Sequence, residues 1–164
     1  MLFLKSDYWI IVDELESSGA HDYKLPFHFV DSAHPSVSVE DDCHVIRERP
    51  QNDDGLEIFV IASGGRWQDE SGWVSQAYRQ RARAAVPTFV FRAEGPTRIL
   101  TFLFPRRASQ PNISVRELET GKAFEVYDGI VRDRLVLGNT VDFRLRWQRL
   151  GDDSEPLEMV TIPV

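Results

Sequence analysis

The chain has 164 residues, of which 42% are hydrophobic and 27% charged, and its formal net charge is −7. This length fits one domain, and the composition is that of an ordinary globular protein rather than a disordered one. The acidic charge disfavours nucleic acid as a partner, because sequence-independent binding needs many cationic contacts to phosphates. No apolar run approaches the about 18 residues of a transmembrane helix, so we expect no membrane partner.

Charge is unevenly distributed along the chain. Residues 1–65 carry 4 basic against 13 acidic residues, residues 66–107 carry 8 against 3, and residues 108–164 carry 7 against 10. Only the middle segment is net positive, so it is the segment that suits an anionic partner.

Two apolar segments open the chain. Residues 7–13 alternate so that both faces are apolar, which is typical of a strand buried on both sides. Residues 21–30 predict a second strand with one apolar face, formed by Tyr23, Leu25, Phe27 and Phe29. The Ser17-Ser18-Gly19 turn between the two segments predicts that they form a hairpin.

Ten further strand-like segments follow, at residues 36–39, 43–48, 56–62, 88–92, 97–104, 113–117, 123–127, 130–137, 140–148 and 157–162. Turn signals about 8–12 residues apart predict an all-β fold, an antiparallel β-sandwich or barrel forming a single domain over residues 1–164. Asp128-Gly129 predicts a tight hairpin. Residues 75–86 fit least well: helix formers with a thin apolar stripe leave open a short helix or, as the favoured interpretation, an irregular Arg-rich loop.

Cysteine and histidine offer little conventional chemistry. Cys43 is the only cysteine, which excludes an intramolecular disulfide and a cysteine-based zinc site. Asp41, Asp42, Cys43 and His44 are adjacent in the sequence, and we interpret them as a polar loop entering a strand, with an autonomous hydrolase site as the alternative. Acidic surroundings disfavour the thiolate that such a nucleophile needs. His28 alone makes no metal site, since zinc takes three or four ligands.

Arginines alternate with aromatic residues in the positive segment. Arginine binds carboxylate and sulfate through two parallel hydrogen bonds, and aromatic faces stack on sugar rings. The candidate substrate-binding residues are Trp73, Tyr78, Arg79, Arg81 and Arg83. The alternative is that Trp67 and Trp73 are core residues and that the arginines form a solvated loop, which pairs with the acidic segment 1–65.

Several stretches together resemble a known family. Residues 2–15, 18–21 and 25–29, then 72–78, 84–88 and 99–105, resemble in order and spacing the C-terminal β-sandwich region of heparinase II/III-like polysaccharide lyases. The resemblance covers residues 2–105. One departure is Arg79, at a position where the family commonly has a glycine after its tyrosine.

The resemblance implies a sandwich of the lyase supersandwich type, which follows an α-helical toroid. Such enzymes remove the proton α to a uronate carboxyl group and eliminate the 4-linked sugar. The implied catalytic tyrosine and histidine lie in the toroid and in an earlier His-rich strand, and no segment of this sequence matches either. We therefore expect no catalytic residue in this chain, which would be an incomplete or non-catalytic module of a lyase acting on acidic, uronate-containing polysaccharide. The alternative is a free-standing carbohydrate-binding or interaction module.

The same resemblance implies partners, cofactors and a location. The partners would be the acidic polysaccharide and an upstream lyase domain. If upstream strands are missing, residues 2–15 would present an unpaired edge or an uncovered face at which a homodimer could form. His28 falls where some members place a structural metal ligand, but their other ligands come from upstream strands, so we expect no cofactor here. The family suggests a periplasmic or secreted protein; residues 1–7 are no signal peptide, so the chain is cytosolic or lacks its targeting segment.

Overall fold

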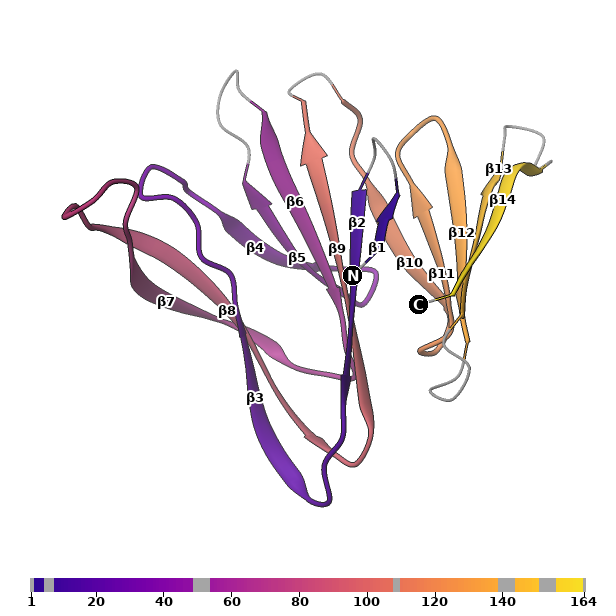
Figure 1. Ribbon diagram of the computed structural model, residues 1–164, viewed down its shortest axis with the longest axis horizontal. Helices are drawn as coiled ribbons and strands as arrows, with labels where there is room; N and C mark the ends of the chain where they lie inside the picture. Colours follow the sequence, from indigo (N-terminus) through magenta and orange to yellow (C-terminus); the bar gives the residue numbers. More distant parts are fainter. Residues whose placement is uncertain are drawn as a thin grey trace. The chain divides into compact units, whose positions relative to one another are not determined.

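The computed structural model describes residues 2–4, 8–48, 54–107, 110–138, 144–150 and 156–163. Every regular element in these ranges is a β-strand, and the strands pair antiparallel in three sheets, which confirms the predicted all-β, antiparallel class (Figure 1). The described part contains no helix long and apolar enough to cross a membrane. Contacts divide the chain into two compact units, Met1–Ala108 and Ser109–Val164, so the single domain over residues 1–164 stays a prediction.

The first unit contains a six-stranded sheet in the order β1-β2-β9-β6-β5-β4. Its strands are β1 (Leu2–Leu4), β2 (Tyr8–Leu15), β4 (Ser36–Glu40), β5 (Cys43–Glu48), β6 (Gly55–Ile61) and β9 (Thr97–Arg106). Strand β2 pairs with β9 over residues 9–15, whereas β1 covers only residues 8–10 on its other side. Among the described residues, the edge predicted for residues 2–15 is therefore formed by β1 and by residues 11–15. As predicted, β2 is apolar on both faces: Tyr8 is buried against the ring of Phe104, with centroids 4.7 Å apart, and Trp9 on the other face is half-buried.

A three-stranded sheet in the order β3-β8-β7 completes this unit. It consists of β3 (Ala20–Pro26), β7 (Arg66–Val74) and β8 (Ala82–Glu94). The predicted hairpin between the first two segments is wrong, because β2 pairs with β9 whereas β3 pairs with β8. The physical reason is burial: β2 has two apolar faces and suits the six-stranded sheet, whereas β3 has one, and its other face meets solvent.

The interpretation of residues 75–86 as a short helix or a loop also needs correction. The structure has no helix there: residues 82–86 begin the long strand β8, and only residues 75–81 form a loop. Strand β7, which the sequence interpretation missed, pairs with β8 over its full length. Tertiary pairing overrides the helix propensity of Ala82, Ala84 and Ala85, because each of them is paired with a residue of β7.

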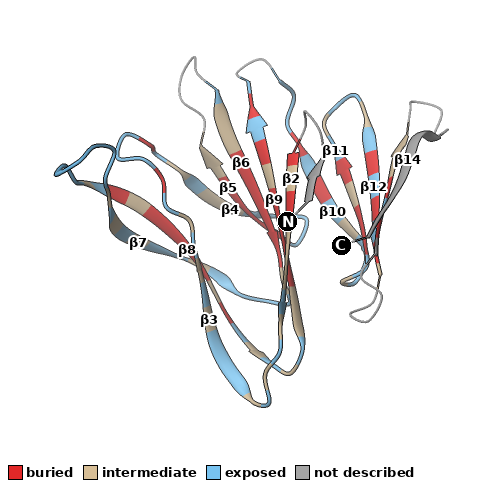
Figure 2. Ribbon diagram, in the orientation of Figure 1, coloured by how far each residue is buried: buried red, intermediate tan, exposed pale blue. Residues whose placement is uncertain are grey.

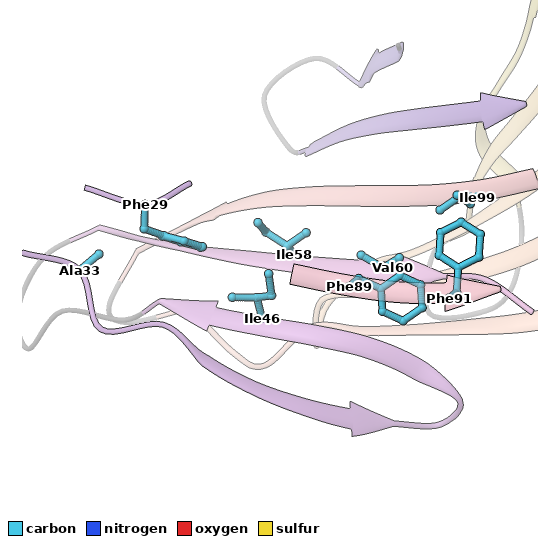
Figure 3. Packing of buried hydrophobic residues seen from close by; sticks show 8 residues of the cluster. All are labelled: Phe29, Ala33, Ile46, Ile58, Val60, Phe89, Phe91 and Ile99. Carbon is cyan, nitrogen blue, oxygen red and sulfur yellow. The ribbon is translucent and has the colours of Figure 1, made fainter. Parts of the chain in front are cut away.

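The two sheets of the first unit pack face to face around one apolar cluster (Figure 3). Ile46, Ile58, Val60 and Ile99 come from the six-stranded sheet, Phe89 and Phe91 come from β8, and Phe29 and Ala33 come from the segment after β3. The predicted inward residues Tyr23, Leu25 and Phe27 pack against this cluster. The unit is therefore a two-layer antiparallel sandwich, as predicted.

The second unit is a five-stranded antiparallel meander in the order β10-β11-β12-β13-β14. Its strands are β10 (Ser114–Glu119), β11 (Ala123–Tyr127), β12 (Arg132–Leu137), β13 (Arg144–Leu150) and β14 (Pro156–Pro163). The predicted tight hairpin is confirmed, because the Asp128 carboxylate accepts hydrogen bonds from the N–H groups of Ile130 and Val131 and closes the turn from β11 to β12. Residues 140–143 of the strand predicted at 140–148 lie outside the described ranges.

Candidate functional site

The hairpin of β7 and β8 carries all five predicted substrate-binding residues. Register pairs Trp73 with Arg83 directly across the two strands, and residues 75–81 form the connecting loop (Figure 1). The loop is closed locally, because the carbonyl oxygen of Ala77 accepts hydrogen bonds from the Ser75 hydroxyl and from the backbone N–H of Gln80, at 3.0 Å in each case. We call this loop with Trp73 and Arg83 the hairpin tip.

Trp73 brings two of the predicted arginines together. The guanidinium carbons of Arg81 and Arg83 lie 4.6 and 4.7 Å from the centre of its indole ring, within the range of cation–π attraction. Arg83 also donates a hydrogen bond of 2.8 Å to the Ser71 hydroxyl, and this bond holds the Arg83 guanidinium group beside the indole ring. Trp73 nevertheless remains 51% exposed, so it is no core residue.

Tyr78 and Arg79 form a second aromatic–arginine pair in the loop. Tyr78 is 87% exposed, and the Arg79 guanidinium carbon lies 5.4 Å from the centre of its ring. Arg79 adopts a φ of +62°, a conformation that glycine adopts without strain. Compared with the glycine that the family commonly has at this position, Arg79 therefore keeps the left-handed backbone conformation and adds a side chain.

Within the part of the chain that the structure describes, no carboxylate forms an ion pair with the arginines of the hairpin tip. None of Arg79, Arg81 and Arg83 forms an ion pair with a residue in the described ranges. The carboxylate of Glu70 lies on the opposite face of β7 from Trp73 and is bound by Lys24, with Nζ and Oε1 2.7 Å apart. The pairing with segment 1–65 that the alternative required is thus not seen, and three cationic groups face solvent.

One polar contact that sequence reasoning did not anticipate ties the loop to a neighbouring segment. The Gln76 amide nitrogen donates a 2.5 Å hydrogen bond to Asp31, in the turn that follows β3. The sequence separation of 45 residues explains why no local pattern signalled it. Asp31 thereby anchors the loop at a residue beside the arginine-bearing positions.

His28 lies on the other face of the same sheet. A Cβ atom added to Gly72 would come within 3.3 Å of its imidazole, and successive strand residues point to opposite faces, so Gly72 and Trp73 face opposite ways. His28 is therefore separated from the arginine group by the sheet. The described residues offer no group of three His, Cys, Asp or Glu side chains suited to a metal, and the donor set at His28 does not fit one.

The Asp41-Asp42-Cys43-His44 cluster does not assemble into a site. Asp41 and Asp42 are exposed in the turn between β4 and β5, whereas Cys43 and His44 are buried and, as neighbours on β5, face opposite ways. His44 packs against Phe89 with ring centroids 4.4 Å apart, and this burial lowers the pKa of its imidazole below the usual value. A nucleophile, a base and an orienting acid do not converge here.

Comparisons with known proteins bear on the family and the fold. A family model described as Heparinase II/III-like, C-terminal, matches residues 1–116. A search of curated proteins found no match. Two solved structures of a heparinase III gene product, one with methylated lysines, are similar in fold: 14% identity with a TM-score of 0.59 over 96% of this chain, and 17% with 0.61 over 99%. The matched region is 22% of each of those chains, so this chain spans about a fifth of their length.

Proposed function

Because the chain belongs to the heparinase II/III-like C-terminal family, we propose that it is a non-catalytic β-sandwich module of a polysaccharide lyase that helps to bind an acidic, uronate-containing polysaccharide. The partner that carries out the elimination would be an upstream lyase domain. The module's own part would be to hold the polysaccharide chain at the hairpin tip.

The observation that carries this proposal is the group formed by Trp73, Arg81 and Arg83. Two guanidinium groups within 5 Å of one indole ring repel each other, so an anion placed between them would relieve that repulsion. A carboxylate or sulfate also matches the planar donor pattern of arginine. The exposed indole adds an apolar face of the kind that stacks on sugar rings.

A binding experiment tests this role. Fluorescence anisotropy of labelled heparin and alginate oligosaccharides at low salt would compare the wild-type chain with the hairpin-tip variant Arg81→Gln/Arg83→Gln. The matched control is Arg66→Gln/Arg92→Gln, which removes two exposed charges from the same sheet. Among the described residues this control loses one ion pair, that of Arg92 with Asp22, in which both side chains are exposed, and such pairs contribute little stability.

We expect the hairpin-tip variant to bind about tenfold more weakly than the control, since each exposed charged contact contributes about 0.2–1 kcal/mol. Affinity should fall with added salt, because exposed charges are screened over about 8 Å at physiological ionic strength. Equal affinity of the two variants would contradict the role of the hairpin tip.

The second candidate is a free-standing carbohydrate-binding or interaction module. It is favoured by one feature: Trp73, Arg81 and Arg83 are brought together by a single hairpin of this chain. A coding region upstream that encodes a catalytic tyrosine and a His-rich strand would decide for the lyase module. A native transcript without that region would decide for the free-standing one.

A further inference from the structure

The exposed face of the second unit's sheet concentrates arginine. Alternation places the buried residues Phe124, Leu135 and Trp147 on one face of β11, β12 and β13, and exposed residues on the other, as Figure 2 shows along β12. The exposed face carries four arginines with described side chains: Arg116, Arg132, Arg134 and Arg146. We call these four the arginine face. Segment 108–164 is acidic as a whole, so its net charge does not reveal these cations.

Among the described side chains, one carboxylate, that of Glu125, contacts these arginines, while the nearby Glu119 is bound by Lys122. Glu125 accepts a 2.6 Å hydrogen bond from Arg116 and lies 3.6 Å from Arg132. Arg134 and Arg146 form no ion pair with any residue in the described ranges, although Arg134 is opposite Glu125 in the register. Four guanidinium groups and one carboxylate leave an excess of three positive charges on an open sheet.

The spacing of the arginine face suits an extended ligand. Residues two apart on a strand are about 7 Å apart and neighbouring strands about 4.8 Å, so the four arginines cover a patch about 14 Å on each side. Tyr127 is 38% exposed on the same face and lies under Arg132, whose guanidinium carbon is 5.4 Å from the ring centre. One aromatic face among spaced cations fits a chain of linked sugars with periodic acidic groups better than it fits stacked nucleobases, which need several aromatic platforms.

We propose that the arginine face is a second binding surface for acidic polysaccharide, distinct in its residues from the hairpin tip. The choice of a polysaccharide over another polyanion rests on the proposed function. The arginine face itself rests on the register and the ion pairs of the second unit.

The test adds the variant Arg134→Gln/Arg146→Gln to the anisotropy series with labelled heparin oligosaccharide. Both residues are exposed and have no ion pair to lose among the described residues, so folding should be unaffected, and circular dichroism would verify it. Each variant in the series removes two charges, which equalises the change in net charge. We expect the arginine-face variant to bind about tenfold more weakly than Arg66→Gln/Arg92→Gln.

The outcomes separate the two proposals. Loss of affinity in the arginine-face variant alone supports this surface and contradicts the hairpin tip as the site. Loss in the hairpin-tip variant alone overturns the arginine face and leaves the proposed function intact. Single-stranded DNA that binds more tightly than heparin, and loses affinity in the arginine-face variant, overturns polysaccharide as the ligand.

Discussion

The guanidinium group of Arg81 lies over the indole ring of Trp73, with 4.6 Å between the guanidinium carbon and the ring centre. Arg81 is the last residue of the loop, and Trp73 lies near the end of β7. The contact holds a cation beside an exposed aromatic face, the two groups through which we propose that an acidic sugar binds. The contact also limits the conformations of an otherwise long and mobile side chain, so less entropy is lost when a ligand binds.

Replacing Trp73 should weaken ligand binding more than it weakens the fold. In Trp73→Ala both arginines lose their platform, and we expect affinity for a heparin oligosaccharide to fall about fivefold to tenfold, while unfolding free energy changes by about 1 kcal/mol or less. Trp73→Phe keeps a smaller ring and should recover part of the affinity. Titration with the oligosaccharide and urea denaturation measure the two quantities. A variant that loses stability but keeps full affinity would make Trp73 a structural residue.

The isolated chain should not carry out elimination. The product of elimination is an unsaturated uronate that absorbs in the ultraviolet, so heparin, heparan and alginate incubated with the chain should give no rise in absorbance. The reason is that Tyr78 has arginines but no histidine beside it among the described residues, since His28 lies across the sheet, and no segment of this sequence matches the family's catalytic tyrosine or histidine. A sustained rise that is abolished by Tyr78→Phe would contradict the non-catalytic role.

His44 should make stability depend on pH. Burial against Phe89 lowers the pKa of its imidazole in the folded state, so between that pKa and the ordinary value of 6.5 the unfolded chain binds more protons. Stability from this residue is therefore complete above pH 6.5 and is lost as pH falls through the folded-state pKa. His44→Leu should flatten this part of the profile, measured as unfolding free energy in urea between pH 8 and pH 5. An unchanged slope in the variant would assign the dependence to other groups.

Gly65 is required by the start of β7. Its φ is +122°, and a Cβ atom there would lie 2.3 Å from the Phe89 ring, which is fully buried in the core cluster. Gly65→Ala should therefore cost both backbone strain and displacement of the ring, about 2–4 kcal/mol together. Gly64→Ala is the matched control, because its φ is also positive but nothing lies near its Cβ position. Thermal unfolding of the two variants should show the larger loss at Gly65.

The parts of this fold that follow from alternation were predictable, and the parts that depend on long-range pairing were not. Tyr8 and Trp9 indicate a strand apolar on both faces, and the structure uses both faces. The partner of that strand is β9, more than 80 residues away, and a turn between neighbours wrongly suggested β3 instead. Local pattern reports burial, whereas pairing is decided by which apolar faces fit together in space.

The same division applies to the candidate sites. The five residues of the hairpin tip were visible because arginine and aromatic side chains follow closely in sequence. The arginine face was hidden, since Arg116, Arg134 and Arg146 come from three strands and share a face only after the sheet has formed. The net charge of residues 108–164 gave no sign of the arginine face, because the acidic residues of this segment outnumber its basic residues.

Arg79 allows the conformation of the loop to be tested apart from its charge. A side chain at a φ of +62° costs about 1–2 kcal/mol, whereas glycine adopts this conformation freely but loses more entropy on folding. Arg79→Gly should thus be about 1 kcal/mol more stable to urea than Arg79→Ala, which keeps the strain. Both variants lose the contact with Tyr78 and one positive charge, so both should bind a heparin oligosaccharide about twofold to fivefold more weakly than wild type. If Arg79→Ala proves the more stable of the two, the left-handed backbone at this residue is wrong; if both keep wild-type affinity, Arg79 takes no part in binding.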